Sequence, residues 1–390
     1  MTTALSEEPP NRKIAALLGN GVSIAFNPGL ALSKINAGIR ARLNEDVPDG
    51  DPAAVLTEAA NKIDTGDPYI DFESLLGPLD QQHDFIAMMA EYARIIGKTD
   101  ETAAEHLKAS AQFVRDVRRT GTSFALEIID AQSRASWDRM EGLTGFVTGL
   151  RAAAGGQRLT IANLNYDSLV MACLSDGYSG EFCDLARGYG ASFFEVLHGV
   201  QWVGHPLRQI ADFPPTRKTR LIHLHGSLTW LKQPGSGLIY RFRTEDLRMY
   251  DFWEKWRDGE TDWQPVVVLT NQTAKTEVVK EQPYALAYSV TEESLIESDR
   301  WLIAGYSFRD ECVNEMLARA WKARVRKPDI LVIGHGDSPS TAEVLKAIGH
   351  HWWEDADPSA FLTIERGGLE AAMASDAWNR WADMPSAEAA

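Results

Sequence analysis

Short apolar runs alternate with polar, glycine-containing turns along much of this chain of 390 residues. Most of the runs are nearly all apolar, which is typical of strands that are buried on both faces of a sheet. The predicted strands are residues 13–18, 158–162, 220–224, 265–269, 300–304 and 329–333.

Helical patterns follow most of these predicted strands. Residues 167–174, 310–324 and 341–348 carry apolar positions at spacings of three and four. Strands that alternate with helices form a parallel sheet with helices on both sides. The sequence therefore predicts an α/β fold, a doubly wound (Rossmann-like) parallel sheet.

Residues 33–156 interrupt this alternation. They are rich in Ala, Glu, Arg and Met, and stretches such as 82–96 and 103–117 have helical periodicity. We therefore predict a large helical insertion domain. The predicted division is a flexible lead over 1–12, an α/β domain over 13–32 and 157–384, the helical insertion over 33–156, and a tail over 385–390.

The charge balance limits the partners that the chain can have. Lys and Arg number 39 and Asp and Glu number 55, a formal net charge of −16. An acidic protein repels polyanions at long range, so no direct nucleic-acid binding is expected, although a small phosphate-bearing ligand remains compatible.

Three cysteines, Cys173, Cys183 and Cys312, are too few for a four-thiolate zinc site, and no zinc is expected. The N-terminus has no signal-peptide pattern, and no apolar run approaches the roughly 20 residues that span a bilayer. A cytoplasmic protein without membrane contact is predicted.

Small and polar residues follow five of the predicted strands. In a doubly wound sheet, ligands bind beyond the carboxyl ends of the strands, so these residues predict a long polar cleft. The five segments are GNGVS (19–23), NLNYDS (163–168), HLHGS (223–227), GYSFRD (305–310) and GHGD (334–337).

Each segment also has a purely structural interpretation. Gly19 and Gly21 are compatible with a tight turn, and the third glycine of a GxGxxG fingerprint would fall at Ile24. Asn165 or Asp167 is a suitable N-cap. His223 and His225 share one face if the segment is extended, but two histidines make a poor metal site.

The two histidines have different expected roles. We expect His223 to be a buried, hydrogen-bonded core residue. His225 lies at the strand end and is the better candidate for a base, because imidazole changes its charge near neutral pH.

Taken in order, GNGVS, NLNYD, HLHGS and GYSFRD resemble the sirtuin-like family. The closest resemblance is to the bacterial sirtuin-like proteins of antiphage defence, which hydrolyse NAD rather than deacylate lysine. The segment from Leu269 to Tyr284 with Tyr288, Glu292 and Glu293, and residues 71–76 in the insertion, also resemble that branch.

The resemblance implies a role for each matching residue. Asn165, Asp167 and His225 would be catalytic, with Asn165 and Asp167 orienting the nicotinamide ribose and a water. NAD would be the substrate. The residues implied in its binding are Gly19, Asn20, Gly21, Ser23, Asn165, Asp167, Gly226, Ser227, Gly305, Ser307, Asn314, Gly336 and Asp337.

Two departures from the family pattern affect this interpretation. Asn20 replaces the usual alanine, so its side chain would either add a contact or crowd the phosphates. The four-cysteine zinc module of the sirtuin deacylases is missing, which disfavours protein deacylation.

The chemistry agrees with a hydrolase. Nicotinamide leaves NAD as a neutral base, and the ribose passes through an oxocarbenium-like state. Such a site needs a positioned water, polar groups around the ribose and a base for a ribose hydroxyl.

The resemblance also implies control, because an unregulated NAD hydrolase would kill its host. The chain has little room for a separate sensor, so a homo-oligomer, a HerA-family ATPase partner or both are expected. The helical insertion, near Trp137, is the predicted oligomer interface, unless its apolar residues form its own core. The alternatives to hydrolysis are a non-hydrolytic NAD or ADP-ribose sensor, a scaffold subunit of an ATPase complex, and a protein deacylase.

Overall fold

The computed structural model describes residues 13–45, 72–96, 101–136, 139–188, 191–270, 272–350 and 357–382. The predicted lead (1–12), the tail (385–390), Trp137 and Asn271 lie outside the described residues. So does the beginning of the 71–76 segment.

A parallel sheet of seven strands forms the centre of the fold, as the sequence predicts. The central strand β1 pairs with β10 on one side and with β2 on the other. In sheet order the strands are β12 (Leu362–Glu365), β11 (Asp329–Ile333), β10 (Arg300–Ala304), β1 (Ile14–Leu18), β2 (Leu159–Asn163), β6 (Thr219–His223) and β3 (Phe182–Cys183).

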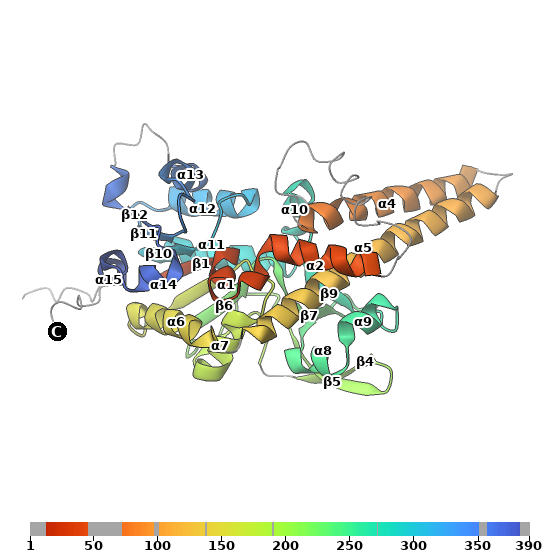
Figure 1. The fold of residues 1–390 in the computed structure, drawn as a ribbon, viewed down its shortest axis with the longest axis horizontal. Helices are drawn as coiled ribbons and strands as arrows, with labels where there is room; N and C mark the ends of the chain where they lie inside the picture. The colour runs from red at the N-terminus through yellow and green to blue at the C-terminus, as the bar shows by residue number, and fades with distance from the viewer. Residues whose placement is uncertain are drawn as a thin grey trace, which may run out of the picture.

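Alternate residues of the strands face two separate cores. In β1, Ile14, Ala16 and Leu18 belong to one core, and Ala15 and Leu17 belong to the other. Helices cover both faces, which confirms the doubly wound α/β fold (Figure 1). On the first face lie α1 (Asn20–Phe26), α6 (Met140–Ala154), α7 (Leu169–Tyr178), α14 (Gly368–Met373) and α15 (Asp376–Ala382), and on the second lie α11 (Tyr284–Glu297), α12 (Glu311–Ala323) and α13 (Thr341–Ala347).

A second, antiparallel sheet is built from strands that lie between β3 and α11 in the chain, on both sides of β6, and it was not predicted. The assignment of residues 265–269 to the parallel sheet was wrong, because β9 pairs antiparallel with β7. An apolar run indicates burial but not the strand that will pair with it, which is the reason for the error. The strands, in sheet order, are β4 (Ser192–Leu197), β5 (Val200–Pro206), β8 (Ile239–Arg241), β7 (Gly226–Lys232) and β9 (Gln264–Val267), with α8 (Thr244–Met249) and α9 (Phe252–Arg257) in the same region.

The described part of residues 33–156 is helical. After η1 (Pro28–Leu30) come α2 (Leu32–Glu45), α4 (Phe72–Ile96) and α5 (Glu101–Ala135). Helices α4 and α5 pack into a hairpin that projects from the body (Figure 1). Helix α6 also falls in this range but packs against β2 and α7. The division into domains stays a prediction.

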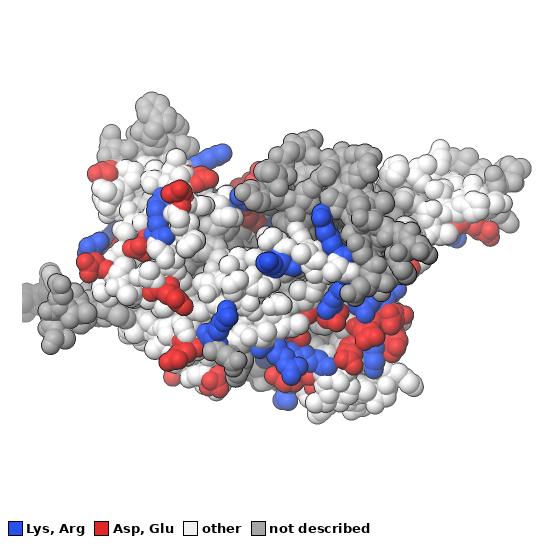
Figure 2. Space-filling model, viewed as in Figure 1, with Lys and Arg blue, Asp and Glu red and all other residues white. Residues whose placement is uncertain are grey.

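Charged side chains of both signs lie on the surface (Figure 2). On the face shown in Figure 2, the described Lys and Arg side chains are interspersed with Asp and Glu. No helix within the described residues is long and apolar enough to cross a bilayer.

Candidate functional site at the carboxyl edge of the parallel sheet

The loops after β1 and β10 meet where the strand order reverses. Chain order runs outward from β1 through β2 to β6 on one side, and from β10 to β12 on the other. The backbone N–H of Gly19 donates to the carbonyl of Ala304 at 2.9 Å, and that of Gly21 donates to the carbonyl of Gly305 at 2.9 Å. Ligands of doubly wound folds bind at such a switch point.

Glycine is required in these loops because their backbones touch. A Cβ atom on Gly21 would lie 2.6 Å from Cα of Gly305. Gly305 has a φ of 62°, and a Cβ atom there would lie 2.4 Å from the backbone nitrogen of Val22. The packing of the loops therefore explains these glycines, and the phosphate contact that we expected for them stays a prediction.

Asn165 joins the loop after β2 to the glycine loop. Its side-chain amide donates to the hydroxyl of Ser23 at 2.8 Å and to the carbonyl of Gly19 at 3.1 Å. The Ser23 hydroxyl in turn donates to the carboxyl of Asp167. Asn165, Asp167 and Ser23 are all buried. Three of the residues predicted to bind NAD therefore lie in one hydrogen-bonded network beside β1.

Burial raises the pKa of the Asp167 carboxyl, and this effect outweighs the hydrogen bonds from Ser23 and from the backbone N–H of Leu169, which lower it. The N–H of Leu169 lies 3.0 Å from the Asp167 carboxyl, at the beginning of α7. The structure places Ser168 at the N-cap, not Asn165 or Asp167. Asp167 nevertheless supports the start of this helix.

His225 follows β6 and lies against Asp310 and Lys275. Its Nε2 atom lies 3.2 Å from Oδ2 of Asp310, and the same oxygen accepts a hydrogen bond from Nζ of Lys275 at 3.0 Å. All three side chains are more than nine-tenths buried. Asp310 is the N-cap of α12, and Lys275 belongs to α10 (Gln272–Val278). Sequence reasoning did not identify Lys275 or assign Asp310 to the site.

His223 ends β6 and is buried, as predicted. Neither ring nitrogen makes a hydrogen bond of good geometry within the described residues, and the backbone of Asn165 is the hydrogen-bonding group that acts on the ring. Burial lowers the pKa of His223 to about 4, so the ring is neutral near pH 7. Its ring packs edge-on against Trp230. Because β6 ends at His223, the two histidines are not parts of one strand.

Several predicted NAD-binding residues have structural contacts of their own. The Asn20 side chain donates to the carbonyl of Leu30 at 3.3 Å. A Cβ atom on Gly226 would lie 2.1 Å from the carbonyl oxygen of Val266, so β9 packs directly against the backbone of Gly226. The Ser227 hydroxyl pairs with that of Thr229.

The remaining predicted residues lie at the same edge of the sheet. Asn314 supports the loop after β10, because it donates to the carbonyl of Phe308 and accepts from the hydroxyl of Tyr306, both at 2.8 Å. Ser307, Gly336 and Asp337 are exposed. Their contact with NAD stays a prediction.

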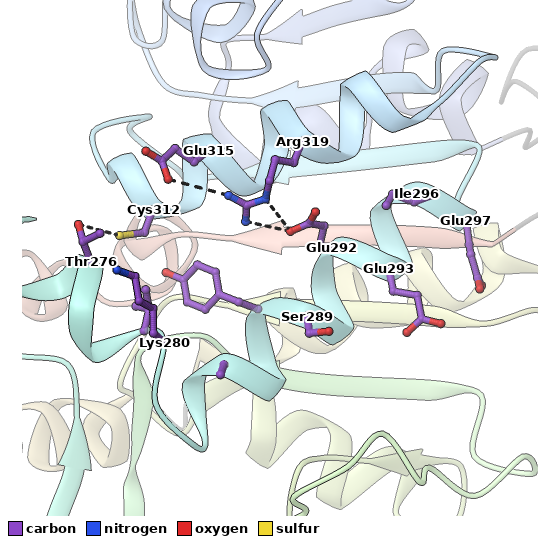
Figure 3. A pocket seen from close by; sticks show the side chains of 13 residues that line it. Thr276, Lys280, Ser289, Glu292, Glu293, Ile296, Glu297, Cys312, Glu315 and Arg319 are labelled. Carbon is purple, nitrogen blue, oxygen red and sulfur yellow. Dashed lines mark hydrogen bonds and ion pairs between the residues drawn. The ribbon is translucent and has the colours of Figure 1, made fainter.

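A groove of about 630 Å³ opens between α10, α11 and α12. Tyr288, Glu292 and Glu293, noted above for their resemblance to the bacterial branch, line it. Figure 3 shows Arg319 bridging Glu292 and Glu315 on its wall. These residues are separate from the network around Asn165.

Comparison with known proteins identifies the family. Residues 159–355 match the SIR2-like domain, which is half of the chain. This protein belongs to the SIR2-like family. Its loops after β2, β6, β10 and β11 all lie within the matched range, whereas the glycine loop precedes it.

A solved chain from a structural study of the mechanism and regulation of Sir2 enzymes is also similar. The match covers 96% of this SIR2-like chain and 92% of that chain, with 11% identity and a TM-score of 0.32. Among curated proteins, no sequence matches.

The SIR2-like domain indicates an NAD-dependent activity and NAD as a ligand. Within the described residues, no group of three or more His, Cys, Asp or Glu side chains is placed to hold a metal ion. The three cysteines are buried and unpaired with one another. Whether the SIR2-like protein lacks zinc stays a prediction.

Proposed function

We propose that the protein hydrolyses NAD to nicotinamide and ADP-ribose. The observation that carries this proposal is the network of Asn165, Ser23 and Asp167 at the switch point of the sheet. Polar groups that are locked before the substrate arrives lose little entropy when they orient it. His225, whose Nε2 atom lies 3.2 Å from Asp310, follows the neighbouring strand β6 and is the candidate base.

The proposed chemistry assigns one task to each group. Asn165 orients the ribose and a water, and Asp167 holds Asn165 in place through Ser23. The bond from the ribose to the pyridinium nitrogen breaks, and nicotinamide leaves as a neutral base while positive charge develops on the ribose. His225 takes the proton of a ribose hydroxyl, which stabilises that charge. Water attacks the ribose and loses one proton to solvent, and His225 returns its proton to the ribose hydroxyl, so that one proton is released for each NAD hydrolysed.

We further propose that this activity serves an antiphage abortive response. Support comes from the resemblance of the motifs to the bacterial NAD-hydrolysing branch. Depletion of NAD would stop both the host and the phage, so the activity must be restrained until infection. We propose a homo-oligomer and a HerA-family ATPase as the controlling assemblies.

The proposed function is tested by measuring nicotinamide release from NAD, for the purified chain alone and with the ATPase partner. We expect release of nicotinamide and ADP-ribose in equal amounts. In addition to these two reactions, a third contains the chain, NAD and an acetylated lysine peptide. Acetyl transfer to ADP-ribose would instead establish the deacylase, and binding of NAD without release would establish the sensor.

An exposed apolar stripe on α4 supports self-association. Its side chains recur every three or four residues, as on one face of a helix, and they are between 36% and 68% exposed. With roughly 150–250 Å² per large side chain, about half of it exposed, the stripe offers on the order of 600 Å², near the roughly 800 Å² per partner of a standard interface. The stripe consists of Phe85, Met88, Met89, Tyr92 and Ile95, with Phe113 of α5 beside it.

The double variant Phe85→Ser/Tyr92→Ser will weaken self-association by at least about thirtyfold, as expected for loss of about 2 kcal/mol at a central contact. Light scattering behind size-exclusion chromatography measures it over a range of concentrations. Lys108→Ser, at an exposed position on α5, is the control and will keep the wild-type mass. An unchanged mass of the double variant would exclude the stripe as the interface.

A further inference from the structure

Lys275, a buried lysine, contacts the same carboxylate of Asp310 as His225 does. Oδ2 of Asp310 lies 3.0 Å from Nζ of Lys275 and 3.2 Å from Nε2 of His225. The other carboxylate oxygen accepts the backbone N–H of Val313 at 3.1 Å. One carboxylate oxygen of Asp310 is therefore anchored to α12, and the other oxygen faces both Lys275 and His225.

Stability alone does not account for this pair. Lys275 is only 2% exposed, and burying an ammonium costs more than burying an apolar side chain of the same length. Replacing a buried ion pair by apolar residues is often neutral or stabilising. Groups whose pKa is strongly perturbed cluster at functional sites, and Asp310 is such a group and contacts the candidate base.

The charges of the pair act on His225 in opposite senses. Burial alone would raise the pKa of Asp310, but His225 and Lys275 outweigh it and hold the pKa well below its ordinary value. Asp310 is therefore a carboxylate near pH 7. A lone carboxylate would favour the imidazolium form of His225, which is unable to accept a proton. The ammonium of Lys275 cancels that influence.

Two further titratable groups, Tyr306 and Cys312, face Asp310 and are neutral near pH 7. The ring of Tyr166 lies 6.3 Å from that of His225, centroid to centroid. Burial raises the pKa of both Tyr306 and Cys312, which face Asp310. Within the described part of the chain, Asp310 and Lys275 are thus the charges placed against His225.

We propose that Asp310 and Lys275 are positioning residues for His225. Asp310 orients the imidazole ring, and Lys275 offsets the charge of Asp310 so that the carboxylate does not oppose acceptance of the proton of a ribose hydroxyl by the ring. This inference rests on the proposed hydrolysis of NAD, and it assigns to that site two residues that act through His225 rather than on the substrate.

The test is the pH profile of kcat/KM for nicotinamide release by Lys275→Met, Asp310→Asn and the double variant. Lys275→Met leaves the carboxylate alone with His225, so the acid limb will move up by about one pH unit. At a pH below the acid limb, kcat/KM of Lys275→Met is about tenfold lower than that of the wild type. At high pH it returns to within about twofold of the wild-type value. KM for NAD changes by less than about twofold, because neither residue touches the substrate.

Asp310→Asn will move the acid limb in the opposite direction, because the ammonium of Lys275 then repels a protonated His225. The double variant Lys275→Met/Asp310→Asn has no net charge beside the ring, as in the wild type, and its limb will return to within about 0.3 pH units of the wild type. It also removes the unpaired buried charge that each single variant carries, so it keeps the test valid where a single variant does not fold.

Two controls separate positioning from folding. Lys275→Arg keeps the charge and will keep the acid limb, and Lys280→Met removes an exposed lysine of the same region without effect. An equal loss of rate at every pH, or limbs that do not move in opposite directions, would overturn the proposal.

A second measurement does not depend on turnover. Proton uptake by the His225 ring, followed by NMR and assigned with His225→Gln, will move up in pH in Lys275→Met and down in Asp310→Asn. If the wild type released no nicotinamide but these shifts appeared, the proposed hydrolysis of NAD would be wrong, and the proposed action of Asp310 and Lys275 on His225 would be correct. Unmoved titrations would refute the pairing itself.

Discussion

Asn165→Ala lowers nicotinamide release by at least about a hundredfold, because a misplacement of about 1 Å at a reacting centre costs on that order. The amide of Asn165 is the group that joins Ser23 and the carbonyl of Gly19 to the loop after β2. Without it, the proposed water and ribose hydroxyls have no fixed partner. The effect should fall mainly on kcat in an assay with purified protein and saturating NAD.

The fold should survive this substitution, since it removes two hydrogen bonds worth about 1 kcal/mol each. Thermal unfolding of Asn165→Ala is measured beside that of Asn379→Ala, a half-buried position on the remote helix α15. Asn379→Ala should retain wild-type activity. A folded Asn165→Ala variant that releases nicotinamide at the wild-type rate would remove Asn165 from the mechanism and with it the observation that carries the proposed function.

Gly305→Ala lowers the free energy of unfolding by about 2–4 kcal/mol, through overpacking and the left-handed backbone. The new Cβ atom would lie 2.4 Å from the backbone nitrogen of Val22 and 2.6 Å from the carbonyl carbon of Gly21. Neither is the end of a flexible side chain, so the two loops must separate. Urea unfolding measures the loss of stability, and isothermal titration calorimetry should show weaker binding of NAD.

Gly145→Ala is the matched control. It lies in α6, and a Cβ atom there would meet nothing within 4 Å. Alanine favours a helix over glycine by up to about 1 kcal/mol, so this variant should be as stable as the wild type or more stable. If Gly305→Ala matched Gly145→Ala in stability and in NAD binding, the close contact of the loops would not matter to the protein.

Local patterns were sufficient where burial and spacing alone define the element. The runs at 13–18, 158–162, 300–304 and 329–333 are central strands in the structure, and the helices after them begin where polar residues follow. The run at 265–269 has the same composition but belongs to the antiparallel sheet. Strand pairing is a long-range property, so composition did not distinguish the two cases.

The candidate functional site shows the same difference between local patterns and long-range contacts. Asn165, Asp167 and His225 were found from polar residues at strand ends, whose positions in a doubly wound sheet follow from topology. Lys275 had no local signal, because a lysine on a short helix is usually solvent-exposed. A buried position next to an acidic N-cap is the signal that identifies it, and burial is visible only in the folded chain.

By itself, the sequence determined the α/β class, the order of the central strands along the chain and the polar residues at their carboxyl ends. Hydrophobic periodicity encodes these features, because each depends on neighbours within a few residues. The tertiary structure alone decided that Gly19 and Gly21 pack on Gly305 and that Asp310 is shared by His225 and Lys275. These contacts join segments that are 35 to almost 300 residues apart, and only the packing of the whole sheet and its helices brings them together.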